Sequence, residues 1–234
     1  MSDLIDTTEM YLRTLFELEE EGVLPMRARI RERLAQSGPT VSETVARMQR
    51  DGLVMVADGD HHLEFTAAGR EAATRVMRKH RIAECMLVEV IGMPWEDVHA
   101  EACRWEHVMS DAVERRMLEI LGNPNVSPYG NPIPGLQELR PEFDITEVIV
   151  GEVRPLSLIS SPELLGVTVR RFGEPIQVDA QTMTRLRRVG ALPGAFVQVR
   201  RSPGGVSIGS AGEYTELADE LAMYVLVDAV AFGV

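Results

Sequence analysis

The sequence has only two cysteines, Cys85 and Cys103, in 234 residues. Two cysteines are too few for a disulfide framework, which favours a reduced, cytoplasmic protein. No stretch approaches the roughly 20 uninterrupted apolar residues that a membrane-spanning helix needs. The first residues, MSDLIDTTEM, are polar and acidic and do not resemble a signal peptide. We therefore expect a cytoplasmic protein without a membrane partner.

Catalytic signatures are missing as well. The sequence contains no nucleophile elbow, phosphate-binding loop or dinucleotide fingerprint. The segment HAEACRWEH, residues 99–107, differs from the HExxH motif of metalloproteases because its histidines are eight positions apart. We therefore do not expect an enzyme.

Positive charge is scarce overall but concentrated in one segment. The formal net charge is -12, which by itself argues against a nucleic-acid partner. Residues 27–50, however, contain six arginines and only two glutamates, a local balance of 6 − 2 = +4. A basic segment on an acidic body can still bind DNA, and the acidic remainder weakens non-specific binding.

The apolar pattern of the first 73 residues predicts a winged helix-turn-helix. Helices are expected over residues 3–21 and roughly 26–34, followed by a turn. Ser37 is a suitable cap for a third helix whose inward positions are Val41, Val45 and Met48. Two apolar runs then flank Asp58-Gly59, which is typical of a hairpin. A hairpin after a helix-turn-helix is the element order of a winged helix.

The rest of the chain is predicted to form a helical segment and then a β segment. Helices are expected from Thr66 to about Ile91, over roughly 95–109 and over about 111–121, followed by a Pro- and Gly-rich loop. Short β runs from about residue 148 and one helix in QTMTRLRRVGA favour a small β barrel. We therefore predict an α+β protein with a DNA-binding domain at 1–73, a helical domain at 74–140, a linker at 141–150 and a β domain at 151–234.

Four potential metal ligands recur on one predicted helix. His99, Cys103, Glu106 and His107 are spaced i, i+4, i+7 and i+8, which places them on one face. An apolar core would not select a carboxylate and two imidazoles, and a solvated face rarely carries a cysteine. The preceding helix carries His80 and Glu84 at i and i+4. Two ligand groups on neighbouring helices suggest two metal positions.

Simpler interpretations apply to single residues. A lone His–Glu pair on a helix is usually a surface pair, and a lone cysteine such as Cys103 is usually a small buried hydrophobe. We assign Cys85 to the core, and His61 and His62 to a solvated wing. Trp95 and Trp105 are expected in the core or in an interface.

Long segments of the chain resemble the diphtheria toxin repressor family, in its actinobacterial branch of iron-dependent regulators. The similarity is close over the first ~140 residues and looser beyond. It rests on DTTEMYLRTLFELEEEGV, RARIRERLAQSGPTVSETVARMQRDGLV, VMRKHR, HAEACRWEHVMSD and NPIPGL. The resemblance implies a winged helix, a helical dimerisation domain and an SH3-like domain. It also implies a homodimer, or a pair of dimers, that represses iron-uptake genes at palindromic operators on double-stranded DNA.

The resemblance further implies two metal sites in each subunit. Its activating site corresponds to Met10, Cys103, Glu106 and His107. Its ancillary site corresponds to His80, Glu84, His99, Glu174 and Gln177, of which the last two keep the family's Glu-x-x-Gln spacing in FGEPIQ. The sulfur donors favour Fe2+ over Mn2+, and the manganese-sensing relatives have carboxylates in place of Met10 and Cys103. Co2+, Ni2+, Zn2+ or Mn2+ are expected to substitute in vitro.

The implied DNA contacts lie in the basic segment. They are Arg27, Ala28, Ser37, Pro39, Thr40, Ser42, Glu43, Arg47 and Arg50. Glu43 departs from the close relatives, which have glutamine at this position. A carboxylate accepts hydrogen bonds but does not donate them, and it repels phosphate. We therefore expect an altered base preference or weaker binding.

Three alternatives remain open from the sequence. A manganese- or zinc-responsive regulator would have the same fold and differ in the metal that gives DNA binding. A metal-storage or metalloenzyme domain would show turnover or more metal per chain, and it leaves the helix-turn-helix unexplained. A thiol-based redox sensor would lose DNA binding on oxidation of Cys103. The β domain either tunes activation or only stabilises the protein.

Overall fold

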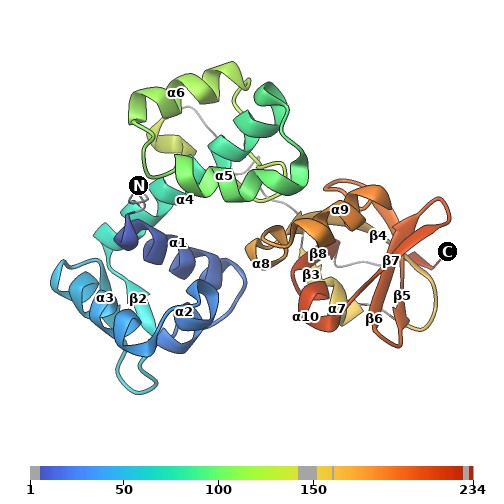
Figure 1. Ribbon diagram of the computed structural model, residues 1–234, viewed down its shortest axis with the longest axis horizontal. Helices are drawn as coiled ribbons and strands as arrows, with labels where there is room; N and C mark the ends of the chain where they lie inside the picture. The colour runs from blue at the N-terminus through green and yellow to red at the C-terminus, as the bar shows by residue number, and fades with distance from the viewer. Residues whose placement is uncertain (1–5, 142–151, 160, 229–231, 234) are drawn as a thin grey trace.

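Three groups of elements follow one another along the chain (Figure 1). The computed structural model describes residues 6–141, 152–159, 161–228 and 232–233. The expected linker 141–150 lies outside these ranges except for residue 141. Residues 3–5, the start of the first expected helix, also lie outside them. The first group consists of α1 (Thr7–Glu20), α2 (Arg27–Leu34), α3 (Gly38–Arg50) and the antiparallel hairpin β1 (Val54–Val56) and β2 (Leu63–Phe65).

Local signals explain the helix boundaries of this winged helix. The Asp6 carboxylate accepts hydrogen bonds from the backbone N–H groups of Thr8 and Glu9 and so caps α1. Ser37 caps α3 as predicted, by accepting from the Thr40 N–H at 3.3 Å. Between α2 and α3 the chain turns at Ala35, whose φ of 50° is left-handed. The predicted inward residues of α3, Val41, Val45 and Met48, are all buried in the first hydrophobic core.

The middle group is helical. It contains α4 (Ala67–Met86), its π-helical continuation η1 (Leu87–Ile91), η2 (Trp95–Asp97), α5 (Val98–Trp105), α6 (Asp111–Ile120) and η3 (Leu136–Glu138). The expected domain boundary at residue 73 falls inside α4, which is continuous and packs against α1. Buried Arg81 on α4 donates to Glu20 on α1 at 3.0 Å.

The predicted helix over 95–109 is shorter than expected. It is helical only to Trp105, and Glu106 and His107 lie in the turn that follows. After this turn, Ser110 caps α6 in an extended conformation (φ −75°, ψ 156°). An extended cap residue requires the chain to leave the preceding helix before it.

The third group is an antiparallel sheet with short helices. Four of the expected short β runs, near 165–171, 196–200, 206–208 and 223–227, form strands, and the expected helix in QTMTRLRRVGA is present. Their bounds are β4 (Leu165–Phe172), β5 (Phe196–Ser202), β6 (Gly205–Ser210), β8 (Val225–Asp228) and α9 (Ala180–Arg188). Sequence patterns did not predict β3 (Val153–Pro155), α7 (Leu156–Ile159), α8 (Glu174–Gln177), β7 (Glu213–Leu217), α10 (Asp219–Ala222) and β9 (Phe232–Gly233). The strand order is β3-β8-β4-β5-β6-β7, with β9 beside β4.

One continuous hydrophobic core joins the helical group to the sheet. Trp95 lies 5.2 Å from Tyr129 and 5.6 Å from Phe172, measured between ring centroids. The Asn131 side chain donates to the Phe172 carbonyl at 2.8 Å. These contacts confirm a core role for Trp95, and they hold α8 near α4 and α5. Among the described residues, no helix is long and apolar enough to span a membrane.

Candidate metal centre and DNA-binding face

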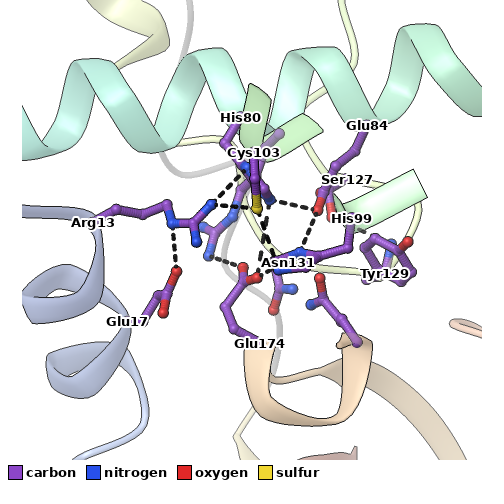
Figure 2. A network of polar contacts seen from close by, with 12 residues as sticks. Arg13, Glu17, His80, Glu84, His99, Cys103, Ser127, Tyr129, Asn131 and Glu174 are labelled. Atoms are coloured by element: carbon purple, nitrogen blue, oxygen red, sulfur yellow. Dashed lines mark hydrogen bonds and ion pairs between the residues drawn. The ribbon is translucent and has the colours of Figure 1, made fainter. Parts of the chain in front are cut away.

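The five residues expected at the ancillary site come from three elements. His80 and Glu84 lie one turn apart on α4, His99 is on α5, and Glu174 and Gln177 form the ends of α8. His80 Nε2 lies 2.9 Å from Glu84 Oε1, and His99 Nδ1 lies 3.1 Å from Glu174 Oε2. The ligand atoms of these four residues lie within 4.8 Å of one another, an arrangement that could hold a metal ion (Figure 2).

Hydrogen bonding within this cluster is incomplete. Seven buried side-chain atoms of these five residues have no hydrogen-bond partner outside the cluster among the described residues, and four of them contact only one another, in the His80–Glu84 and His99–Glu174 pairs. They are His80 Nε2, both oxygens of Glu84, His99 Nδ1, both oxygens of Glu174 and Gln177 Oε1. Burying polar atoms without partners is costly, so their convergence fits a site built for a cation. Imidazole, carboxylate and amide donors also suit a first-row divalent metal.

The residues expected at the activating site are not gathered into one cluster. Cys103 Sγ lies 3.6 Å from His99 Nε2. The ligand atoms of Cys103, His80 and His99 lie within 4.8 Å of one another, so Cys103 is close to the ancillary residues. Glu106 Oε2 lies 2.5 Å from His80 Nδ1, whereas Glu106 Oε1 lies 3.3 Å from His107 Nε2. Partly buried Met10 packs against the core of the winged helix.

Two residues of α1 that sequence reasoning missed enter this region. Arg13 Nη1 donates to Cys103 Sγ at 2.8 Å, and its Nε lies 3.0 Å from Glu17 Oε1 (Figure 2). The same Nη1 donates to Glu106 Oε2 at 3.1 Å. Glu9 Oε2 lies 2.7 Å from His107 Nδ1. The available signal was spacing, because Arg13 follows Met10 by three positions and thus shares its side of α1.

The two cysteines differ in electrostatic environment. Burial raises the pKa of the Cys103 thiol, but the Arg13 charge and then His99 lower it more, and the net pKa is well below the ordinary value. Burial raises the pKa of Cys85, and the nearby Glu84 charge adds to the effect. Cys103 is therefore prepared as a thiolate ligand. Cys85 is fully buried, which confirms its assignment to the core.

Most of the expected DNA contacts lie on the solvent side of α3. Ser37 caps this helix, and Pro39, Thr40, Ser42, Glu43, Arg47 and Arg50 are exposed on it. Arg27 and Ala28 begin α2. The opposite side of α3 is buried, so the helix presents one polar face outward, on which Arg47 and Arg50 outnumber Glu43. That division is typical of a recognition helix. On the wing, His61 is exposed, whereas His62 is half-buried and contacts Asp60 and Glu64.

The helical group also exposes large apolar side chains. They are Val90 and Ile91 in η1, and Val113 and Ile120 in α6, each at least half exposed. Apolar groups in one helical domain are often covered by a partner surface.

Comparisons with known proteins give a consistent result. Residues 3–62 match the family described as iron dependent repressor, N-terminal DNA binding domain, and residues 66–135 match its metal binding and dimerisation domain. The iron-dependent repressor IdeR of Mycobacterium leprae is 55% identical over 232 residues, covering 98% of this chain and 100% of that protein. The diphtheria toxin repressor of Corynebacterium glutamicum is 51% identical over 230 residues, covering 98% and 99%.

Solved structures support the same fold. A manganese-dependent transcriptional repressor in complex with manganese has a TM-score of 0.76 and 26% identity, covering 97% of this chain and 100% of that chain. The crystal structure of IdeR from T. acidophilum has a TM-score of 0.72 at 25% identity, covering 95% and 98%.

Proposed function

The chain belongs to the iron-dependent repressor family of transcriptional regulators, and we propose that it represses transcription when ferrous iron occupies two sites in each subunit. The observation that carries the proposal is the convergence of His80, Glu84, His99 and Glu174, because His80 Nε2, His99 Nδ1 and the carboxylate oxygens have no hydrogen-bond partner outside this group among the described residues. Buried Gln177 ends α8, the helix that begins at Glu174. These five residues form the proposed ancillary site. Family members are repressors rather than enzymes, in agreement with the missing catalytic motifs.

The proposed activating site consists of Met10, Cys103, Glu106 and His107. When bound there, a divalent metal supplies positive charge and a bond to the Cys103 thiolate. Cys103, Glu106 and His107 belong to the helical domain, whereas Met10 lies on α1 beside α3. A Met10 ligand would therefore tie the DNA-binding domain to the helical domain in one orientation. Metal favours the DNA-competent state in this scheme, and operator DNA must raise metal affinity by the same factor.

Iron is the proposed physiological metal because the activating set includes two sulfur donors. The structural neighbour in complex with manganese favours a second candidate, a manganese-responsive regulator on the same fold. Other divalent ions follow the usual affinity order and are expected to substitute in vitro.

The proposed domain limits are 1–73, 74–140, 141–150 and 151–234, with α4 shared by the first two domains.

The proposed partner is palindromic double-stranded operator DNA, bound by a homodimer. A second copy of the chain would cover the exposed apolar residues of η1 and α6. Two-fold symmetry then presents two α3 helices to successive major grooves, so a small change in orientation gives a large change in affinity. The arginines on α2 and α3 are proposed to hold phosphates, which position the helix.

Anaerobic DNA binding with and without Fe2+ tests the proposed function. We expect Fe2+ to raise the affinity for an iron-box palindrome by about 5–150-fold, the range of typical coupling energies, and a chelator to reverse the effect. Mn2+, Zn2+, Co2+ and Ni2+ at equal free concentrations separate the iron and manganese candidates. Sedimentation of the same samples should show two chains per particle. Equal binding of the metal-free protein would exclude the corepressor mechanism.

Glu43→Gln tests the proposed base contact of α3. Glu43 is exposed on the helix and lies between exposed Ser42 and buried Thr44. Glutamine both donates and accepts, so we expect the variant to bind more tightly or to change base preference by roughly 1–3 kcal/mol at one position. Binding to operators with single base changes measures this effect, with the exposed Glu32→Gln on α2 as the control. Unchanged affinity and preference would exclude Glu43 from base recognition.

A further inference from the structure

Arg13 places a positive charge among the proposed ligands of both metal sites. Its side chain is only 12% exposed. Nη1 lies 2.8 Å from Cys103 Sγ, 3.1 Å from Glu106 Oε2 and 3.2 Å from His80 Nδ1. One nitrogen of α1 therefore contacts two proposed activating ligands and one proposed ancillary ligand.

The contacts have a simple electrostatic reason. A buried thiolate and a buried carboxylate are costly without a nearby cation, because both lose their hydration. Arg13 supplies that cation from α1, because its Nη1 is within hydrogen-bond distance of both Cys103 Sγ and Glu106 Oε2. A metal bound to the same sulfur and oxygen would lie close to Nη1. Two cations at such a distance in a buried site repel each other strongly.

We propose that Arg13 is the internal cation of the activating site when no metal is bound, and that metal binding displaces its guanidinium from Cys103 and Glu106. The displacement costs free energy and therefore raises the metal concentration at which the protein responds. The contacts of Arg13 with Cys103 and Glu106 connect α1 to the helical domain in the metal-free protein. The proposed metal bond to Met10, one turn before Arg13 on α1, would replace this connection. The inference rests on the proposed function, since it takes Cys103 and Glu106 as metal ligands.

The structure provides a place for the displaced side chain. Arg13 lines a cleft of about 500 Å³ between α1, α2 and the third domain. Glu17, Glu32 and Glu174 line the same cleft, and Glu17 Oε1 already lies 3.0 Å from Arg13 Nε. The guanidinium can thus leave Cys103 and keep an acidic partner.

Titration with Co2+ under anaerobic conditions tests the inference, because a cysteine–cobalt bond gives a charge-transfer absorption. We expect Arg13→Gln to bind Co2+ at Cys103 about tenfold or more tightly than wild type, within the usual range of coupling between sites. Its metal-free form should unfold at a lower temperature, because Cys103 and Glu106 lose their counter-charge. The control is Arg70→Gln, which removes an ion pair between α4 and α1, formed by Arg70 and Glu19, and should leave Co2+ affinity unchanged.

The outcomes separate the inference from the proposed function. A wild type without the charge-transfer band would refute Cys103 as a ligand, and hence the proposed activating site. A band with unchanged or weaker affinity in Arg13→Gln would refute the displacement alone. If Arg13→Gln does not fold, 15N spectra of arginine side chains in the wild type decide, with Arg13→Lys identifying the signal. The Arg13 Nε signal should move on adding Zn2+, and an unmoved signal in the metal-bound protein would overturn the inference.

Discussion

Cys103→Ala is expected to abolish the stimulation of DNA binding by Fe2+, while metal-free binding stays as in wild type. Cys103 is the proposed ligand with the lowered thiol pKa, and its sulfur contacts Arg13 and His99. Loss of outer-shell partners alone costs about 10–100-fold in metal affinity, so loss of a ligand should cost about 100-fold or more. Anaerobic operator titrations at increasing Fe2+ measure the effect.

Cys85→Ala is the matched control for this experiment. Cys85 is fully buried on α4, its burial raises the pKa of its thiol, and its sulfur lies 3.5 Å from the Val126 carbonyl. Its removal should lower stability slightly and leave the Fe2+ response intact. If Cys103→Ala responds to Fe2+ as wild type does, Cys103 is not an activating ligand. Oxidation that abolishes DNA binding of metal-loaded wild type but not of Cys103→Ala would support the redox-sensor alternative.

Periodicity predicted the long elements of the fold well. The three helices of the first domain have apolar residues at helical spacing and explicit caps such as Ser37, so local signals and tertiary packing agree. The short elements of the third domain were missed. A four-residue helix such as α8 makes too few internal hydrogen bonds to be defined locally, and packing against the core decides its conformation. Glu174 and Gln177 were therefore predicted only through the family resemblance.

The sequence predicted the helical positions of the ligands better for the proposed ancillary site than for the proposed activating site. Spacing paired His80 with Glu84 and grouped His99 with Cys103, and the resemblance joined His99 to the first pair; the structure brings His80, Glu84 and His99 together. The assumption of one continuous helix was wrong for Glu106 and His107, because α5 ends at Trp105 and both residues lie in the turn before α6. Arg13 was not predicted at all. An arginine on an amphipathic helix usually lies in solvent, and only the packing of α1 on α4, which brings Arg13 to Cys103 of α5, buries this one.

Glu174→Ala is expected to reduce bound metal from two ions per chain to one. Glu174 is the acidic ligand that the third domain contributes, and it lies 3.1 Å from His99 Nδ1. A site filled at 100 times its dissociation constant stabilises the folded protein by about 2.7 kcal/mol. For a chain of this size, each kcal/mol corresponds to about 2–4 °C, so metal should raise the melting temperature of the variant by about 5–10 °C less than that of wild type.

The same substitution decides what the third domain does. If Glu174 only holds that domain in place, Glu174→Gln, which keeps the shape of the side chain, should retain two metal ions and the full thermal shift. If it is a ligand, loss of the negative charge should weaken the ancillary site in both variants, because a neutral amide is a poorer donor for a divalent cation. Glu213→Ala on exposed β7 provides the control. Two ions per chain in Glu174→Ala would remove the third domain from metal binding and leave it a stabilising role.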